Sequence, residues 1–164
     1  MGNYKLIKIY GDEDIEKIKN ILKVEPIEIR KNIVAINCGI SLPYFLINNF
    51  IFKENMDHVI LYSNIFLNLI YFILENSTFT LLEIKLVEMQ TEIEELINKY
   101  ITQNQKDNLI SLLEKYILQK NIDVKFIKVK DGGSQEIIIY SNGVINIMGN
   151  NKFELIKGML CSGI

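Results

Sequence analysis

The spacing of apolar residues changes its period along the C-terminal half of the chain. In the first part of this half they recur every three or four residues, which predicts one long amphipathic helix. Thr80 and Glu83 match a capping box at its start. A second amphipathic helix is predicted over 109–119, after a polar break. The apolar face of the first helix consists of Leu82, Leu86, Met89, Ile93, Leu96 and Tyr100.

Beyond the second helix the period falls to two, which is typical of strands. Asn142 and Gly143 form a pair that tolerates positive φ, so they predict a tight hairpin turn. The elements expected in this tail are strands over 122–129, 135–140 and 144–148 and a short helix over 152–160.

The first forty residues predict a β-α-β-β unit, with strands over 4–10, 27–30 and 33–37. Asp12 is expected to cap the helix that follows the first strand, and Pro26 to end it. Lys31 and Asn32 separate the last two strands as a hairpin turn.

Ser41 followed by Pro43 predicts a helix that runs to about Phe52. Asp57 is expected to start another helix, which contains the strongly apolar stretch 59–74. That stretch is shorter than the roughly 20 residues that span a bilayer. Its polar residues lie three or four apart, which indicates a buried helix with one wet edge: Asn64, Asn68, Tyr71 and Glu75.

These elements predict a single compact α+β domain over 1–164, in which amphipathic helices pack on one or two small antiparallel sheets. Its expected parts are the β-α-β-β unit at about 1–40, a helical middle at about 41–120, and a β-rich tail with a hairpin and a short helix at about 121–164. No linker or repeat divides the chain.

The composition is that of an ordinary globular protein, with 49% hydrophobic and 23% charged residues. A net charge of −2 gives no overall basic field for nucleic acid or anionic lipid. Isoleucine, asparagine and lysine abound, whereas Arg30 and Ala35 are alone of their kinds, which indicates a low-GC bacterial genome. Cys38 and Cys161 are far apart and fit structural thiols in a reducing cytoplasm.

Few residues offer chemistry. His58 is the only histidine, and it is expected at a helix N-terminus as a surface or capping residue, which leaves no histidine-based metal site. The Gly-rich segment 131–134 lies between strands and predicts a turn, not a phosphate loop. Glu88, Glu92 and Glu95 would share the outward face of the long helix, where carboxylates are usually solvated.

Lysines cluster at the start of the β-rich tail and offer an alternative function, contact with nucleic acid. Strand alternation would separate Lys125 from Lys128 and Lys130 unless a bulge intervenes. Edge lysines also prevent unwanted strand pairing, which gives them a structural purpose. The full set of possible nucleic-acid contacts is Lys120, Lys125, Lys128 and Lys130.

Three segments together resemble the YtxC-like sporulation proteins of spore-forming low-GC bacteria. They are the motif Phe79-x-x-Leu82-x-x-Lys85, the run from Leu96 to Tyr100, and the run from Leu109 to Tyr116. In that family a similar helix pair precedes a strand, a glycine-containing loop and a hairpin, which here correspond to the last ninety or so residues. The resemblance implies a sporulation context and a cytoplasmic location, without an activity.

From these observations we expect a non-enzymatic intracellular bacterial protein, sporulation-associated, that acts through protein–protein contacts with a partner or a second copy. No cofactor, metal or small-molecule ligand is inferred. The alternatives are a nucleic-acid-associated regulator that uses the lysines of 120–130, and an enzyme with an uncharacterised carboxylate site at Glu88 and Glu92.

Overall fold

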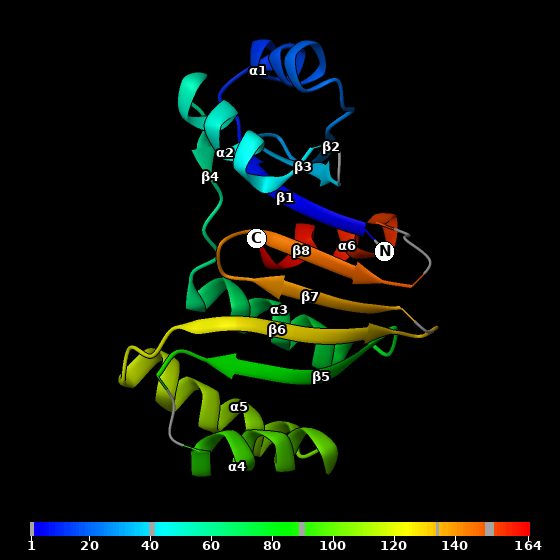
Figure 1. Cartoon of the computed structure of the whole chain (residues 1–164). Helices are drawn as coiled ribbons and strands as arrows, with labels where there is room; N and C mark the ends of the chain where they lie inside the picture. Colours follow the sequence, from blue (N-terminus) through cyan, green and yellow to red (C-terminus); the bar gives the residue numbers. More distant parts are fainter. Residues whose placement is uncertain (1, 40–41, 89–90, 134, 150–152) are drawn as a thin grey trace.

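A single antiparallel sheet of eight strands forms the centre of the computed structural model, which describes residues 2–39, 42–88, 91–133, 135–149 and 153–164 (Figure 1). The strand order is β2-β3-β1-β8-β7-β6-β5, and β4 pairs with β1 beside β8. The strands are β1 (Gly2–Lys8), β2 (Ile27–Arg30), β3 (Ile33–Cys38), β4 (Asp57–His58), β5 (Phe79–Leu86), β6 (Val124–Asp131), β7 (Glu136–Tyr140) and β8 (Val144–Met148).

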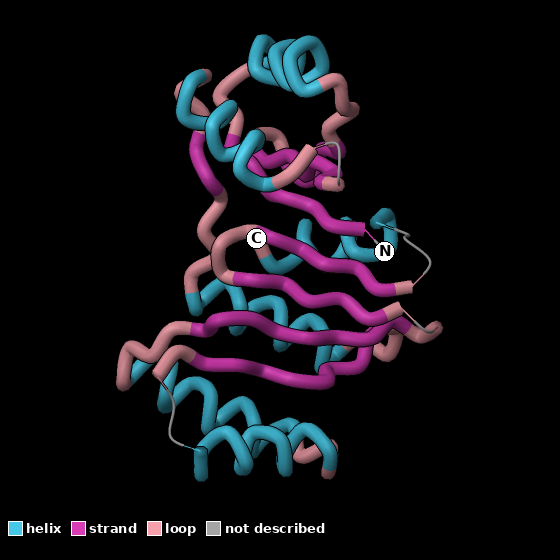
Figure 2. Tube along the Cα trace, in the orientation of Figure 1, coloured by secondary structure: helices cyan, strands magenta, loops and turns pink. Residues whose placement is uncertain are grey.

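Helices cover the two faces of this sheet unequally (Figures 1 and 2). The α-helices are α1 (Asp12–Lys17), α2 (Tyr44–Lys53), α3 (Ser63–Glu75), α4 (Thr91–Thr102), α5 (Lys106–Glu114) and α6 (Phe153–Gly163). Two of them continue as single π-helical turns, η1 (Ile18–Leu22) after α1 and η2 (Lys115–Gln119) after α5. The α+β class expected from the sequence is confirmed.

The larger core lies on the face where α3 packs against α6, β5 and α5. The strands contribute to this core through alternate residues: every second residue of β7 and β8 is buried, while the residues between them are only partly covered. Phe66 of α3 is fully buried at this interface. The inward residues of the two central strands are Ile137, Ile139, Ile145 and Ile147.

A smaller core lies on the opposite face, where α1, η1 and α2 cover the β2-β3-β1 end of the sheet. Ile7 and Ile36 point into it from the strands, and Ile47 and Phe50 from α2. On this side the described helices stop at β1, so the outer face of β8, β7, β6 and β5 has no helix over it in the part of the chain that the structure describes (Figure 2).

The long helix predicted from residue 80 to residue 100 is wrong. Phe79–Leu86 is strand β5, paired along β6, and α4 begins only at Thr91. Thr80 therefore lies within a strand and caps no helix. Met89, which the apolar spacing predicts on the helix face, lies outside the described residues. The β5–β6 register shifts between Leu81 and Glu83, so one extra residue interrupts the alternation that would have revealed the strand.

The helix predicted from Asp57 is also misplaced. Asp57 and His58 form the short strand β4 against β1, and α3 begins at Ser63. The polar stripe along this helix does face outward, as expected, with Asn64, Asn68 and Glu75 exposed. No helix among the described residues is long and apolar enough to cross a membrane.

Most other predicted elements are confirmed. The N-terminal β-α-β-β order, the helix after Pro43, the helix that begins near Leu109 and the closing helix are all present, although Ser41 lies outside the described residues. Gly143 adopts φ +73° in the β7–β8 hairpin. The segment 131–133 turns between β6 and β7, where the Asp131 carboxylate accepts bonds from the backbone N–H groups of Gly133 and Gln135.

Candidate functional site

The four lysines considered for nucleic-acid contact do not form one basic stripe. Lys128 and Lys130 lie on the outer face of β6, and Lys128 pairs with Glu136 at 2.7 Å. Lys125 is exposed and lies where the β5–β6 register shifts, so strand alternation does not determine which face of the sheet it occupies. Lys120 follows η2, with its ammonium 4.4 Å from the ring centre of Tyr116. Carboxylates and ring faces therefore share the surface with these cations.

The glutamates considered as a carboxylate site are also dispersed. Glu88 follows β5 in a turn with φ +54°, while Glu92 and Glu95 lie on α4, so the three do not share one helix face. Glu94 on the same helix forms an ion pair with Lys85 of β5 at 2.5 Å. The described residues hold no group of three His, Cys, Asp or Glu side chains that could bind a metal ion.

A concavity that contains a buried lysine lies where α2 meets the uncovered face of the sheet. We call it the Lys5 pocket. It encloses about 570 Å³. Lys5 enters from β1, Tyr44 and Asn48 from α2, and the β7–β8 hairpin closes one side. The full lining is Lys5, Tyr44, Asn48, His58, Ile60, Tyr140, Asn142, Val144 and Asn146.

Strand pairing explains why these residues meet. Lys5 of β1 lies directly opposite Val144 of β8, and Asn146 lies one outward position further along β8. Because outward residues alternate, Tyr140 on β7 faces the same side as both. The pocket therefore joins the two ends of the chain, which no local pattern can indicate.

Burial dominates the electrostatics of this pocket. Lys5 is only 4% exposed, and its ammonium donates a hydrogen bond to the backbone carbonyl of Asn142. Burial lowers the pKa of Lys5 from its ordinary value. The pKa values of the Cys38 thiol and the Tyr44 hydroxyl are both raised by burial to about 12, so both groups are neutral near pH 7.

His58 lies at the rim, not at a helix N-terminus as predicted. Burial lowers the pKa of His58, the nearby Lys5 ammonium lowers it further, and Asp57 opposes both effects. Asp57 itself accepts a hydrogen bond from the hydroxyl of Tyr10. The carboxylate beside the histidine is thus engaged away from the pocket.

Two buried polar atoms next to this region have no hydrogen-bond partner among the described residues. They are the hydroxyl oxygen of Tyr44 and the side-chain oxygen of Asn3, which lies opposite Asn146. Such atoms are rare in folded proteins because an unpaired buried polar group is destabilising. Both atoms could therefore form a hydrogen bond with a ligand that reaches this end of the uncovered face.

Exposed apolar side chains border the pocket on α2. Phe52 is 85% exposed and Phe45 is 62% exposed, and they are seven positions apart, which is about two helical turns. Asn48 and Asn49 lie between them on the same exposed face. We call these four residues the α2 surface.

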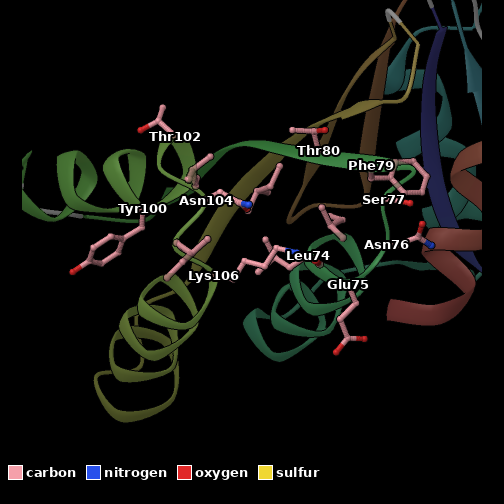
Figure 3. A pocket seen from close by; sticks show the side chains of 14 residues that line it. Leu74, Glu75, Asn76, Ser77, Phe79, Thr80, Tyr100, Thr102, Asn104 and Lys106 are labelled. Carbon is pink, nitrogen blue, oxygen red and sulfur yellow. Dashed lines mark hydrogen bonds between the residues drawn. The ribbon is translucent and has the colours of Figure 1, made fainter.

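A second concavity, of about 510 Å³, lies at the junction of α3, α4, α5 and β5 (Figure 3). Tyr100 of α4 lines it, and Lys106 at the start of α5 donates a hydrogen bond to the carbonyl of Leu74 in the last turn of α3. A cation at that position satisfies a helix C-terminal carbonyl, so this contact is structural.

The sequence predicts His58 as a surface or capping residue and does not single out Lys5, Tyr44 or Asn146. No local pattern could have indicated Lys5, because the residues opposite it on the neighbouring strands, Ile36 and Val144, are far away in the sequence. Comparisons of the chain with protein-family models, curated proteins and solved structures give no match.

Proposed function

We propose that this is a non-enzymatic, cytoplasmic bacterial protein that acts through protein–protein contact, and that the α2 surface binds a second copy of the chain. The observation that carries the proposal is the pair of exposed phenylalanines, Phe45 and Phe52, on one face of α2. Aromatic side chains of this kind supply much of the binding energy at protein interfaces.

The arrangement of the α2 surface favours a second copy as the occupant. Phe45 and Phe52 lie at equal distances on either side of Asn48 and Asn49, and none of the four residues is charged. If two such helices cross antiparallel about a two-fold axis between the asparagines, each Phe45 meets Phe52 of the other copy. The asparagine amides at the axis can then bond to each other as donor and acceptor.

The sporulation context of the proposal rests on the family resemblance. The order of α4, α5, β6, a glycine-containing turn and the β7–β8 hairpin agrees with the order that the resemblance implies. The segment from Phe79 to Lys85 is a strand in this protein, so the part that supports the proposal begins at α4.

Sedimentation velocity over a range of concentrations tests the dimer. Burying four phenylalanine side chains contributes about 6–12 kcal/mol, and association costs at least about 4 kcal/mol, so the net gain is at most about 8 kcal/mol. We therefore expect a weak dimer with a Kd between about 1 µM and 1 mM. Phe52→Ser should remain monomeric at concentrations where the wild-type protein dimerises.

Leu118→Ser is the matched control, because Leu118 is 58% exposed on η2, far from α2 in the chain. It should dimerise like the wild type. A wild-type protein that stays monomeric to about 1 mM, or equal association by Phe52→Ser and Leu118→Ser, would overturn the proposal.

A further inference from the structure

The Lys5 pocket contains a buried lysine that has no carboxylate partner among the residues that the structure describes. None of the nine lining residues is acidic. Within the described part of the chain, the Lys5 ammonium donates to the neutral carbonyl of Asn142 alone, although an ammonium group has three protons to donate. Buried lysines are normally paired with an acidic group, because desolvation of a lone charge is costly.

The acidic residue nearest in sequence to the lining does not compensate this charge. Asp57 precedes His58 in β4 and accepts a hydrogen bond from the hydroxyl of Tyr10, whose side chain is exposed. The groups that do approach Lys5 are the thiol of Cys38 and the imidazole of His58. The pocket therefore keeps an unneutralised cation.

A second buried donor lines the same pocket. The hydroxyl oxygen of Tyr44 is inaccessible to solvent and has no hydrogen-bond partner among the described residues. Because this phenol stays protonated near neutral pH, it offers an O–H. Asn48 and Asn146 add side-chain amides at the walls. An acceptor with negative charge would satisfy both Lys5 and Tyr44.

The remaining walls are apolar. Ile60 and Val144 contribute aliphatic surface, and the rings of Tyr44 and Tyr140 contribute aromatic surface. Small-molecule sites generally combine such walls with a few polar groups that fix orientation. One cation with neutral donors matches a single negative charge better than the double charge of a phosphate monoester.

We propose that the Lys5 pocket binds a small organic carboxylate, whose charged oxygens accept hydrogen bonds from Lys5 and Tyr44 and whose apolar body lies against Ile60 and Val144. The ligand supplies the negative charge that the residues lining the pocket do not provide. Asn48 belongs both to this lining and to the α2 surface, whereas Phe45 and Phe52 lie outside the lining, so Phe52→Ser tests the proposed dimer without changing a wall of the pocket.

Titration of the ¹⁵N-labelled protein, followed by ¹H–¹⁵N correlation spectra at low chloride, tests this proposal. The probes are acetate, hexanoate and benzoate, with hexanamide and benzamide as uncharged matches. We expect saturable shifts at the amides of Asn142 to Val144 and of His58 to Ile60. Hexanoate and benzoate should bind more tightly than acetate, since only they reach the apolar walls.

Substitutions identify the groups responsible. Lys5→Met should weaken hexanoate binding by about 10- to 100-fold, the range expected for a hydrogen bond to a charged group. Tyr44→Phe removes one hydroxyl, leaves the ring in place, and should weaken binding by at least about threefold. Lys8→Met is the matched control, because Lys8 is an exposed lysine on the same strand and should leave binding unchanged.

Three results would overturn the proposal. They are equal binding of the amides and the carboxylates, unchanged affinity in both Lys5→Met and Tyr44→Phe, and the lack of any saturable shift with all three carboxylates at about 10 mM. Tyr44→Phe keeps the test decisive if Lys5→Met does not fold, because it removes only one oxygen atom, which has no hydrogen-bond partner among the described residues.

Discussion

Replacing Gly143 by alanine should destabilise the protein far more than an alanine substitution at a surface turn. Gly143 lies in the β7–β8 hairpin with φ +73°, a left-handed conformation that costs an L-residue about 1–2 kcal/mol. A Cβ atom at this position would approach the backbone carbonyl oxygen of Val59 to 2.5 Å. Overpacking of this kind costs a further 1–3 kcal/mol or so.

The carbonyl of Val59 cannot readily move aside. The segment that carries it is tied to the hairpin by the bond from the N–H of Leu61 to the carbonyl of Ser141, at 2.8 Å. The hairpin is tied to β1 by the bond from the N–H of Leu6 to the carbonyl of Gly143, also at 2.8 Å. We therefore expect the two costs to add, to a loss of about 2–5 kcal/mol in the free energy of unfolding.

Urea unfolding followed by far-ultraviolet circular dichroism measures this loss. Gly158→Ala is the control, because Gly158 is exposed within α6 and an added Cβ would meet nothing within 4 Å. That variant should be more stable than the wild type by about 0.5–1 kcal/mol. A Gly143→Ala variant within about 0.5 kcal/mol of the wild type would refute the reasoning, because neither the backbone strain nor the contact would then exist.

Two further predictions concern titratable groups. In the folded protein at pH 8, a disulfide reagent should modify the partly exposed Cys161 before the buried Cys38, because the pKa of Cys38, about 12, keeps it a thiol. A Cys161→Ser variant shows the rate at Cys38 alone, and equal rates at the two cysteines would contradict the prediction. The unfolded chain binds a proton at His58 more readily than the folded chain, because burial and the Lys5 ammonium lower the folded pKa against the opposing effect of Asp57. Stability should therefore fall as the pH drops below about 6.5, and His58→Gln should lose less between pH 7.5 and pH 5 in urea unfolding; identical losses would exclude His58 as a contributor.

The sequence correctly predicts the elements whose ends are marked by residues with strong local conformational preferences. Proline at position 43 and the Asn-Gly pair at 142–143 fix a helix start and a hairpin without reference to the rest of the chain. The π-helical turn that ends at Gln119 is followed by Asn121 with φ +55°, and asparagine is one of the residues that commonly adopt this left-handed conformation after a helix. In these places local preference and tertiary packing agree.

Strand β5 could not be predicted in the same way. Its buried residues are Phe79, Leu81, Ile84 and Leu86, and the shift of register after Leu81 turns an alternating pattern into one with a gap of three. A gap of three also fits a helix, and Leu82 and Leu86 complete a false helical face with Ile93 and Leu96. Only pairing with β6, which begins nearly forty residues later, decides in favour of a strand.

The same argument explains why Lys5 could not be recognised as a site residue. A lysine in a strand is normally assigned to the solvated face, and alternation along β1 does place Lys5 on the side away from the main core. Helix α2 and the β7–β8 hairpin bury it, and the hairpin lies more than 130 residues away in the chain. A sheet that brings both ends of the chain together can bury a cation without placing an acid beside it in the sequence. The uncompensated charge is therefore a property of the topology, and it becomes visible only when β1 and β8 are seen to be neighbours.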